Sequence, residues 1–262
     1  DPAAFRVPVN VSLRGVSLEK LTVVMPDASE QSVDSLTLAA RLAGDELEVE
    51  ALELRLPQGG LSLSGSAALR PEMPVDLMLL ADGLLPQEPG ARGPPPRASA
   101  GLSVAGTVDW REEGIAAALD YRFTAEGIEG LAPDLPDRVA ASGQLSARQL
   151  ADGLEIGSAS LALEDAPLAL SLRGAVSGTT TADPSLSVEL DWKALRWPLD
   201  STAAAVFLSD QGRIDVSGRV SDYELTLRAS ATGADLPASS WEGRARGHDR
   251  GVVVEFLRGE LL

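Results

Sequence analysis

The sequence predicts an all-β protein: an elongated, curved antiparallel β-sheet, open as a tube or groove, with a hydrophobic concave interior. Apolar residues alternate with polar ones along most of the chain, which is the period of a strand with one apolar and one polar face. A short phrase, apolar-any-apolar-any-glycine, also recurs and ends at Gly15, Gly65, Gly106, Gly143, Gly174 and Gly218. A phrase repeated along a chain is typical of architectures that grow by addition of similar units.

The alternation defines the expected strands in chain order. They cover residues 7–13, 36–42, 47–56, 61–65, 75–81, 102–110, 115–125, 139–147, 154–163, 168–176, 186–192, 214–220, 223–231 and 252–256. Turn residues such as Gly44-Asp45, Gly59-Gly60 and Asp152-Gly153 separate several of them. Because short turns join antiparallel neighbours, we expect a meander. Helical periodicity is absent, so no long helix is expected.

The alternation slips by one residue at three places, which predicts β-bulges. The slips lie between Leu18 and Leu21, within residues 47–56, and between Ile156 and Ala159. Bulges bend and twist a strand, so repeated slips predict a curved sheet. The glycine that ends each phrase is interpreted in the same way, as a point of special backbone geometry.

The domain organisation predicted is one continuous array of strands over residues 1–262, expected to be a fragment of a longer protein. A Pro- and Gly-rich segment at residues 82–99 has no alternation and is expected to be a loop excursion from the sheet. No apolar run approaches the ~18 residues of a membrane-spanning helix, so any membrane anchor is expected outside this chain.

Composition excludes several functions. The formal net charge of −17 argues against nucleic-acid binding, since phosphate backbones would be repelled. The chain has no cysteine, and its single histidine, His248, lies in a predicted turn. Glu46, Glu48 and Glu50 alternate with apolar residues and are interpreted as a solvated strand face. We therefore expect no catalytic residue, no metal and no cofactor, and predict that the protein is not an enzyme.

Aromatic residues make up only 4% of the chain, so the apolar face is mostly Leu, Val and Ala. A closed sandwich core draws on more aromatic residues, whereas an unfilled aliphatic groove does not need them. The four tryptophans end or follow predicted strands and are interpreted as a rim of the apolar face. The residues expected to line the groove are Val9, Val11, Leu13, Leu36, Leu38, Leu61, Leu63, Leu77, Leu79, Leu102, Val104, Leu119, Tyr121, Phe123, Leu161, Leu163, Leu170, Leu172, Leu186, Val188, Leu190, Ile214, Val216, Leu225, Leu227, Val252 and Val254.

A run of motifs between Leu186 and Leu262 resembles the TamB family of AsmA-like, repeating-β-groove proteins, toward their N-terminal part. Its members in order are Trp192-Lys-Ala-Leu-Arg-Trp197-Pro-Leu, Ser209-Asp-Gln-Gly212, Ile214-Asp-Val-Ser-Gly218, Tyr223-Glu-Leu-Thr-Leu, Leu236-Pro, Trp241 and Leu257-Arg-Gly-Glu-Leu-Leu262. The resemblance implies a periplasmic protein of a Gram-negative bacterium with an inner-membrane anchor. It also implies a TamA-like outer-membrane barrel as partner, reached through regions outside this chain.

The first functional hypothesis is a phospholipid conduit, with acyl chains held on the apolar face between the two membranes. The alternative is a β-strand chaperone for outer-membrane proteins or autotransporters, since an open sheet edge can pair with a client strand. A scaffold whose leucines pack on one another is a third hypothesis, and an enzyme is the fourth. The residues leave open the lipid headgroup, the direction of transport, the physiological cargo and the oligomeric state.

Overall fold

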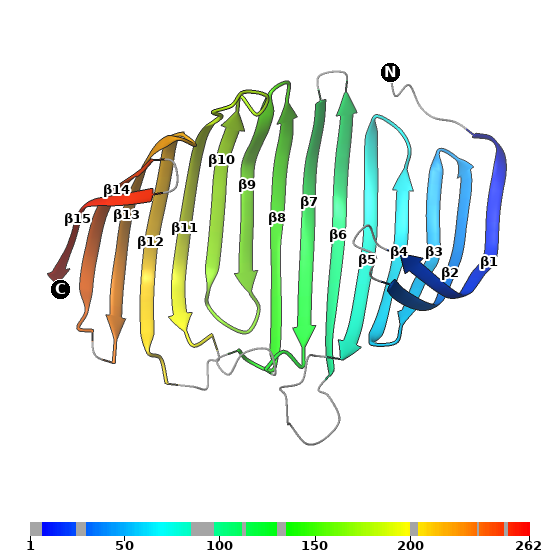
Figure 1. Cartoon of the computed structure of the whole chain (residues 1–262), viewed down its shortest axis with the longest axis horizontal. Coiled ribbons are helices and arrows are strands. Elements are labelled where there is room, and N and C mark those ends of the chain that lie inside the picture. Colours follow the sequence, from blue (N-terminus) through cyan, green and yellow to red (C-terminus); the bar gives the residue numbers. More distant parts are fainter. Residues whose placement is uncertain are drawn as a thin grey trace. The chain divides into compact units, whose positions relative to one another are not determined.

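The computed structural model describes residues 7–24, 30–84, 97–111, 114–129, 135–199, 204–234, 236–248 and 251–262. Within these ranges the chain forms fifteen strands (Figure 1). Their bounds are β1 Val7–Val24, β2 Glu30–Gly44, β3 Glu46–Leu56, β4 Gly59–Ala68, β5 Glu72–Leu84, β6 Arg97–Arg111, β7 Gly114–Glu126, β8 Arg138–Leu150, β9 Gly153–Leu163, β10 Ala169–Ser177, β11 Ser185–Trp197, β12 Phe207–Arg219, β13 Asp222–Gly233, β14 Ser239–His248 and β15 Gly251–Leu261.

The strands belong to one antiparallel sheet in which the strand order is the chain order. In the described ranges β1 pairs with β2 and β15 pairs with β14, and the two end strands do not pair with each other, so the sheet is open. The prediction of an all-β, open antiparallel meander is confirmed. That its concave interior is hydrophobic stays a prediction.

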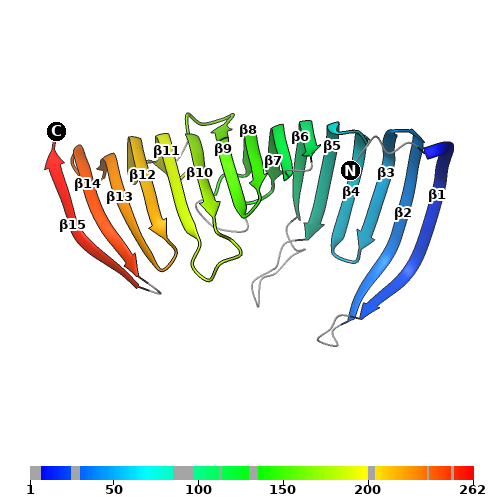
Figure 2. The same ribbon diagram turned by 90° about the horizontal axis from the view of Figure 1, so that it is seen from above.

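The chain divides into two compact units. The first unit consists of residues 1–111, 119–133 and 137–140, and the second of residues 112–118, 134–136 and 141–262. Strands β1–β6 belong to the first unit and β9–β15 to the second, whereas β7 and β8 contribute to both. Within each unit the strands lie side by side in a single layer (Figure 2).

Two of the three predicted bulges are confirmed by the strand register. The pairing of β3 with β4 shifts between Val49 and Leu52, and the pairings of β9 with β8 and β10 shift between Ile156 and Ala159. Between Leu18 and Leu21, however, β1 keeps its register with β2, although Lys20 has a φ of 56°. The two register shifts of β1 lie instead between Val7 and Val11 and between Leu13 and Val16. The second surrounds Gly15, whose φ of 68° suits glycine because it lacks a Cβ.

The Pro- and Gly-rich segment is flanked by paired backbone. Within the predicted loop at residues 82–99, Asp82 lies opposite Ser99, Gly83 opposite Ala98 and Leu84 opposite Arg97, so both of its ends extend β5 and β6. Residues 85–96 lie outside the described residues.

Strand β14 was not predicted from the alternation of apolar and polar residues. On one side of β14, Ser239–His248, the residues are Trp241, Gly243, Ala245 and Gly247, which are mostly too small to register as an apolar stripe. Their pairing with β13 nevertheless extends over the whole strand. The reason for small residues at these positions depends on which residues of the neighbouring strands lie opposite them.

Candidate functional site: the apolar face of each unit

In the second unit, the register gathers the apolar residues of β9–β15 on one face. They form four rows that cross the strands, and every position holds an aliphatic residue, an aromatic residue or glycine. Row one contains Leu161, Leu170, Trp192, Gly212, Ala229, Trp241 and Gly259, and row two contains Ala159, Leu172, Leu190, Ile214, Leu227, Gly243 and Leu257. Row three contains Ile156, Gly174, Val188, Val216, Leu225, Ala245 and Val254, and row four contains Leu154, Val176, Leu186, Gly218, Tyr223, Gly247 and Val252.

The first unit repeats this arrangement over β1–β6. Its four rows are Val11, Leu42, Leu47, Ala67, Val75, Gly106; Leu13, Ala40, Val49, Gly65, Leu77, Val104; Val16, Leu38, Leu52, Leu63, Leu79, Leu102; and Leu18, Leu36, Leu54, Leu61, Ala81, Ala100. No charged, polar or aromatic side chain interrupts these rows. We call the four rows of each unit its apolar face and the opposite side of the same strands its polar face.

The apolar faces contain most of the predicted groove residues. Those from Val11 to Val104 and from Leu161 to Val254 all lie in the rows, except Leu163, which lies beyond row one on the same side of β9 as Leu161. The side chain of Val9 lies outside the described residues. That these side chains contact lipid stays a prediction.

The β7 residues Leu119, Tyr121 and Phe123 are assigned to a face through their neighbour Thr124. The Thr124 hydroxyl lies beside Gly101, 3.0 Å from where a Cβ at that glycine would stand. Gly101 lies opposite Leu80 on the polar face of the first unit. Alternation therefore places Phe123, Tyr121 and Leu119 on the apolar side of β7.

No second layer covers the apolar face among the described strands of either unit, since the strands of each unit form one sheet. Over the described residues, the buried hydrophobic side chains are few and mostly alanine: Ala68, Ala125, Ala140, Ala141, Leu168, Trp192, Ala231 and Ala245. At the sheet ends the apolar side chains are open to solvent, with Leu18 48% and Val254 63% exposed. A sheet face this apolar is normally buried against another layer, so an exposed one is a candidate binding surface.

Aromatic rings of the second unit lie over glycines of the neighbouring strand. Trp192 is opposite Gly212 and Tyr223 is opposite Gly247, and in both pairs the ring occupies the space that a Cβ on the glycine would need. Trp241 is opposite Gly259, with its ring 3.0 Å from that Cβ position. Trp192 and Trp241 both lie in row one, which is an outer row of the four. Sequence reasoning missed the pairs because a ring and its glycine are 18 to 24 positions apart in the chain.

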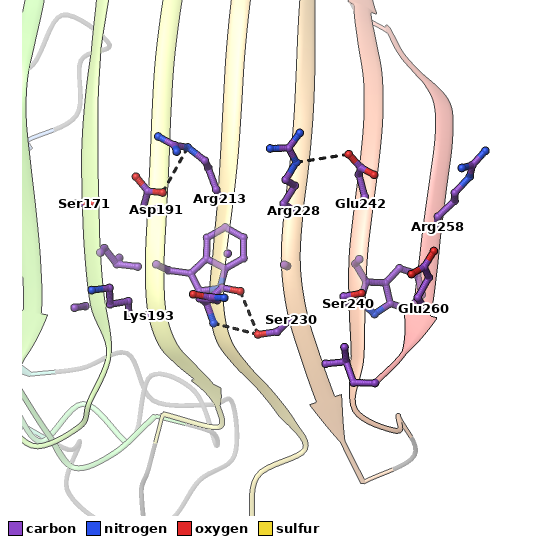
Figure 3. Close-up of a pocket in the computed structure, with 18 of the residues that line it drawn as sticks. Ser171, Asp191, Lys193, Arg213, Arg228, Ser230, Ser240, Glu242, Arg258 and Glu260 are labelled. Atoms are coloured by element: carbon purple, nitrogen blue, oxygen red, sulfur yellow. Dashed lines mark hydrogen bonds and ion pairs between the residues drawn. The ribbon is translucent and has the colours of Figure 1, made fainter.

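The polar face of the second unit carries a network of ion pairs across β10–β15. Glu189 pairs with both Arg173 and Arg213, and the Arg213 Nε lies 3.5 Å from Asp191 and 3.2 Å from Asp215. Arg228 pairs with Glu242 at 3.5 Å, as Figure 3 shows beside the Asp191–Arg213 pair. Arg244 lies 2.5 Å from Glu224 and 3.5 Å from Glu255. The bond from Arg244 holds the pKa of Glu224 below its ordinary value and raises the pKa of Arg244.

A hollow of about 1080 Å³ lies along two rows of this polar face (Figure 3). Its lining includes Asp191, Arg213, Arg228 and Glu242 from one row and Lys193 and Ser230 from the next. By contrast, a hollow of about 40 Å³ lies on the apolar face beside Gly174. The two faces of the second unit therefore differ in chemistry along their whole length.

The polar face of the first unit carries exposed ion pairs. Arg55 lies 3.9 Å from Glu53 with both side chains largely in water, and Arg138 lies 3.4 Å from Glu126. The Glu129 carboxyl is hydrogen-bonded to that of Asp137, and this bond together with the negative charge of Asp137 raises the pKa of Glu129.

The described residues provide no catalytic constellation of the kind that sequence motifs define. They contain no group of His, Cys, Asp or Glu suited to a metal ion. The His248 Nδ1 lies 3.0 Å from the Ser221 carbonyl oxygen, next to the hairpin between β12 and β13. Glu46, Glu48 and Glu50 are exposed on β3, as predicted. In the described part of the chain, no helix has the length and apolarity that a membrane span requires.

Each unit is an open antiparallel meander with one apolar face and one charged or polar face, and this defines the class of open, two-faced β-sheet proteins. The model of the family described as "TamB, N-terminal domain" matches residues 2–110 and 131–262. The chain therefore belongs to the TamB family, and the resemblance inferred from the motifs is confirmed. Members of this family are transport and assembly components of the cell envelope that span the periplasm from an inner-membrane anchor. No solved structure matches the chain.

Proposed function

We propose that the protein conducts phospholipid between the inner and outer membranes, with the acyl chains lying on the apolar faces of its two units. The observation that carries this proposal is the unbroken four-row apolar face, which no described strand of the same unit covers. Water is a poor neighbour for so much aliphatic surface, and an acyl chain would remove it from water.

The free energy of acyl-chain contact with the apolar face suits a carrier that binds hydrocarbon and still lets it move. Each buried CH₂ group contributes about 0.8 kcal/mol, so even part of one chain is held firmly. The rows repeat similar side chains from strand to strand, for example Leu172, Leu190, Ile214 and Leu227 in row two. A chain that moves by one strand therefore exchanges one set of contacts for a nearly equal set.

The setting of this activity follows from the family. We propose that the protein works in the periplasm of a Gram-negative bacterium, anchored in the inner membrane, with a TamA-like outer-membrane barrel as partner. Anchor and partner contact would involve segments outside residues 1–262. The acidic surface, with a net charge of −17, would limit adsorption to anionic membrane surfaces along the way.

To test this proposal, charged side chains are introduced on the apolar face while the polar face is left unchanged. The double variant Leu172→Arg/Val216→Asp alters rows two and three. Ser171→Arg/Ser217→Asp introduces the same charges at adjacent exposed positions of the polar face and is the matched control. Lipid bound to each purified protein is measured by mass spectrometry, and folding by circular dichroism. We expect bound phospholipid in the parent and control and none in the apolar-face variant. Equal lipid in a folded apolar-face variant would refute the proposal.

A chaperone for outer-membrane strands is the second candidate, since an open sheet edge can pair with a client strand. The apolar side chains of β15 are exposed on both faces of the strand, with Val253 at 66% and Val254 at 63%. A photo-crosslinker at Val253 would then capture client strands, and capture would persist in Leu172→Arg/Val216→Asp. Loss of client capture in that variant would exclude edge pairing as its basis.

A further inference from the structure

The aromatic residues on the apolar face of the second unit occupy its outer rows and not its centre. Trp192 and Trp241 lie in row one and Tyr223 lies in row four. Rows two and three, between them, contain aliphatic residues and glycine throughout. We call these three aromatic residues the aromatic border.

Each ring of the aromatic border lies flat against the sheet because its cross-strand partner is glycine. A Cβ at Gly212 would collide with the Trp192 ring, and a Cβ at Gly247 would collide with the Tyr223 ring. A glycine opposite an aromatic residue lets the ring cover the neighbouring strand. The ring face, with its polar atom directed along the sheet, then forms part of the apolar surface.

The two indoles of row one donate hydrogen bonds to serines near the end of the sheet. The Trp192 Nε1 donates a hydrogen bond to the Ser209 Oγ at 2.8 Å, and the Trp241 Nε1 donates to the Ser239 Oγ at 2.9 Å. Ser209 and Ser239 are 1% and 2% exposed, so these hydroxyls belong to the structure of the sheet end.

Beyond row four, polar groups lie beside the hairpin between β12 and β13, which also contains the exposed Val220. There Asp183 accepts hydrogen bonds from the Ser221 amide at 3.0 Å and from the Ser221 hydroxyl at 2.8 Å. Amphipathic rings therefore lie in the rows on either side of the aliphatic centre.

Resting on the proposed phospholipid function, we infer that the aromatic border positions the ligand: it confines acyl chains to rows two and three, where they run across the strands. Tryptophan and tyrosine prefer the boundary between hydrocarbon and polar surroundings, as they do at membrane interfaces. The two central rows are about 7 Å apart, since they are separated by two residues of extended chain. The small hollow beside Gly174 lies at this centre, where row three lacks a side chain.

The test maps where acyl chains lie on the sheet. The protein is incubated with vesicles of a phosphatidylglycerol that carries a diazirine in mid-chain, irradiated and analysed by peptide mass spectrometry. The variant Trp241→Leu/Tyr223→Leu removes aromatic rings and keeps an apolar surface. Trp110→Leu, which removes an exposed tryptophan of the first unit, is the control.

We expect most adducts of the second unit in the parent and the Trp110→Leu control to map to rows two and three. In Trp241→Leu/Tyr223→Leu, the fraction of second-unit adducts that map to rows two and three should fall to about half, because acyl chains would then contact the four apolar rows equally. An unchanged distribution in this variant means that the rings only fill space over glycine, and it overturns the inference. Absence of adducts in all three proteins would instead refute the phospholipid function itself.

Discussion

Each of the two units has an apolar face, but the residues on the apolar faces and on the polar faces differ between the units. Both present four rows of apolar residues, but those of β1–β6 are purely aliphatic, whereas those of β9–β15 include rings laid over glycine. On the polar face of the second unit, ion pairs join β10 to β12 and β13 to β15, whereas the Arg55–Glu53 and Arg138–Glu126 pairs of the first unit are exposed. The shared feature is the surface that the proposed function needs, and the differing features determine how each unit is stabilised.

The largest expected difference concerns tryptophan. Trp192→Ala removes a 9% exposed ring, uncovers Gly212 and leaves the Ser209 hydroxyl without its donor. We expect the free energy of unfolding of the second unit to fall by about 3–5 kcal/mol. Trp110 is 52% exposed, and Trp110→Ala should change the first unit by less than about 1 kcal/mol. Urea unfolding followed by circular dichroism measures both, and equal losses would contradict the comparison.

A smaller effect is expected from filling a glycine site. Gly212→Ala places a methyl group where the Trp192 ring lies, so the ring must turn away from the sheet. Overpacking of this kind costs about 1–3 kcal/mol. Gly157→Ala is the matched control, since the nearest atom to its Cβ would be at 3.6 Å, an ordinary contact. Thermal unfolding of the two variants should separate them, and a Gly212→Ala protein as stable as the control would show that the ring can shift freely.

A third, smaller effect on stability is expected from removing ion pairs on the polar faces of the two units. Glu189→Gln removes the carboxylate shared by Arg173 and Arg213, and we expect a loss of about 1 kcal/mol in the second unit. The loss should shrink as salt is added, because partly exposed pairs are screened. Glu53→Gln in the first unit removes an exposed pair at 3.9 Å and should have no measurable effect. Chemical denaturation at low and high salt compares the two, and a salt-independent loss would argue against an electrostatic cause.

The smallest effect is a pH dependence of opposite sign in the two units. In the second unit the Ser221 amide and hydroxyl lower the pKa of Asp183, so its contribution to stability is present above the ordinary carboxyl pKa and is lost as pH falls through the lowered one. In the first unit Asp137 raises the pKa of Glu129, so its contribution is present at low pH and is lost as pH rises through the raised pKa.

NMR titration of the carboxyl carbons tests both pKa shifts. Ser221→Ala should move the pKa of Asp183 up, and Asp137→Asn should move that of Glu129 down, each toward its ordinary value. Glu224 of the second unit, whose pKa is lowered by Arg244 elsewhere on the sheet, is the internal reference and should not respond to either variant. Shifts in the opposite directions would contradict the assigned hydrogen bonds.

Alternation alone was sufficient to predict the fold and the apolar face. Residues such as Leu61, Leu63, Leu77 and Leu79 repeat every second position, so their common face follows before any pairing is known. The bulges at Val49–Leu52 and Ile156–Ala159 were predictable for the same reason, since an inserted residue reverses the phase.

What the sequence could not provide depends on register. Strand β14 was missed because Gly243, Ala245 and Gly247 are small on the side where neighbouring strands place Leu257 and the Tyr223 ring. The network around Glu189 was equally hidden, since Arg173 and Arg213 lie on strands that flank it in space but are remote in the chain. The alternation of residue types predicts which side chains lie on one face of the sheet. Contacts between those side chains can be predicted only when the register of neighbouring strands is known.

The identity of strand order and chain order has a consequence for how the protein folds. Each inner strand, β2 to β14, pairs with the strand just before it and the strand just after it, so contacts are local in sequence throughout each unit. Local contacts lower the entropic cost of loop closure and speed folding. A chain emerging from its amino end can therefore add one strand at a time to a finished edge. The growing edge extends the apolar face at every step, so most of that face is present before the last strand is in place.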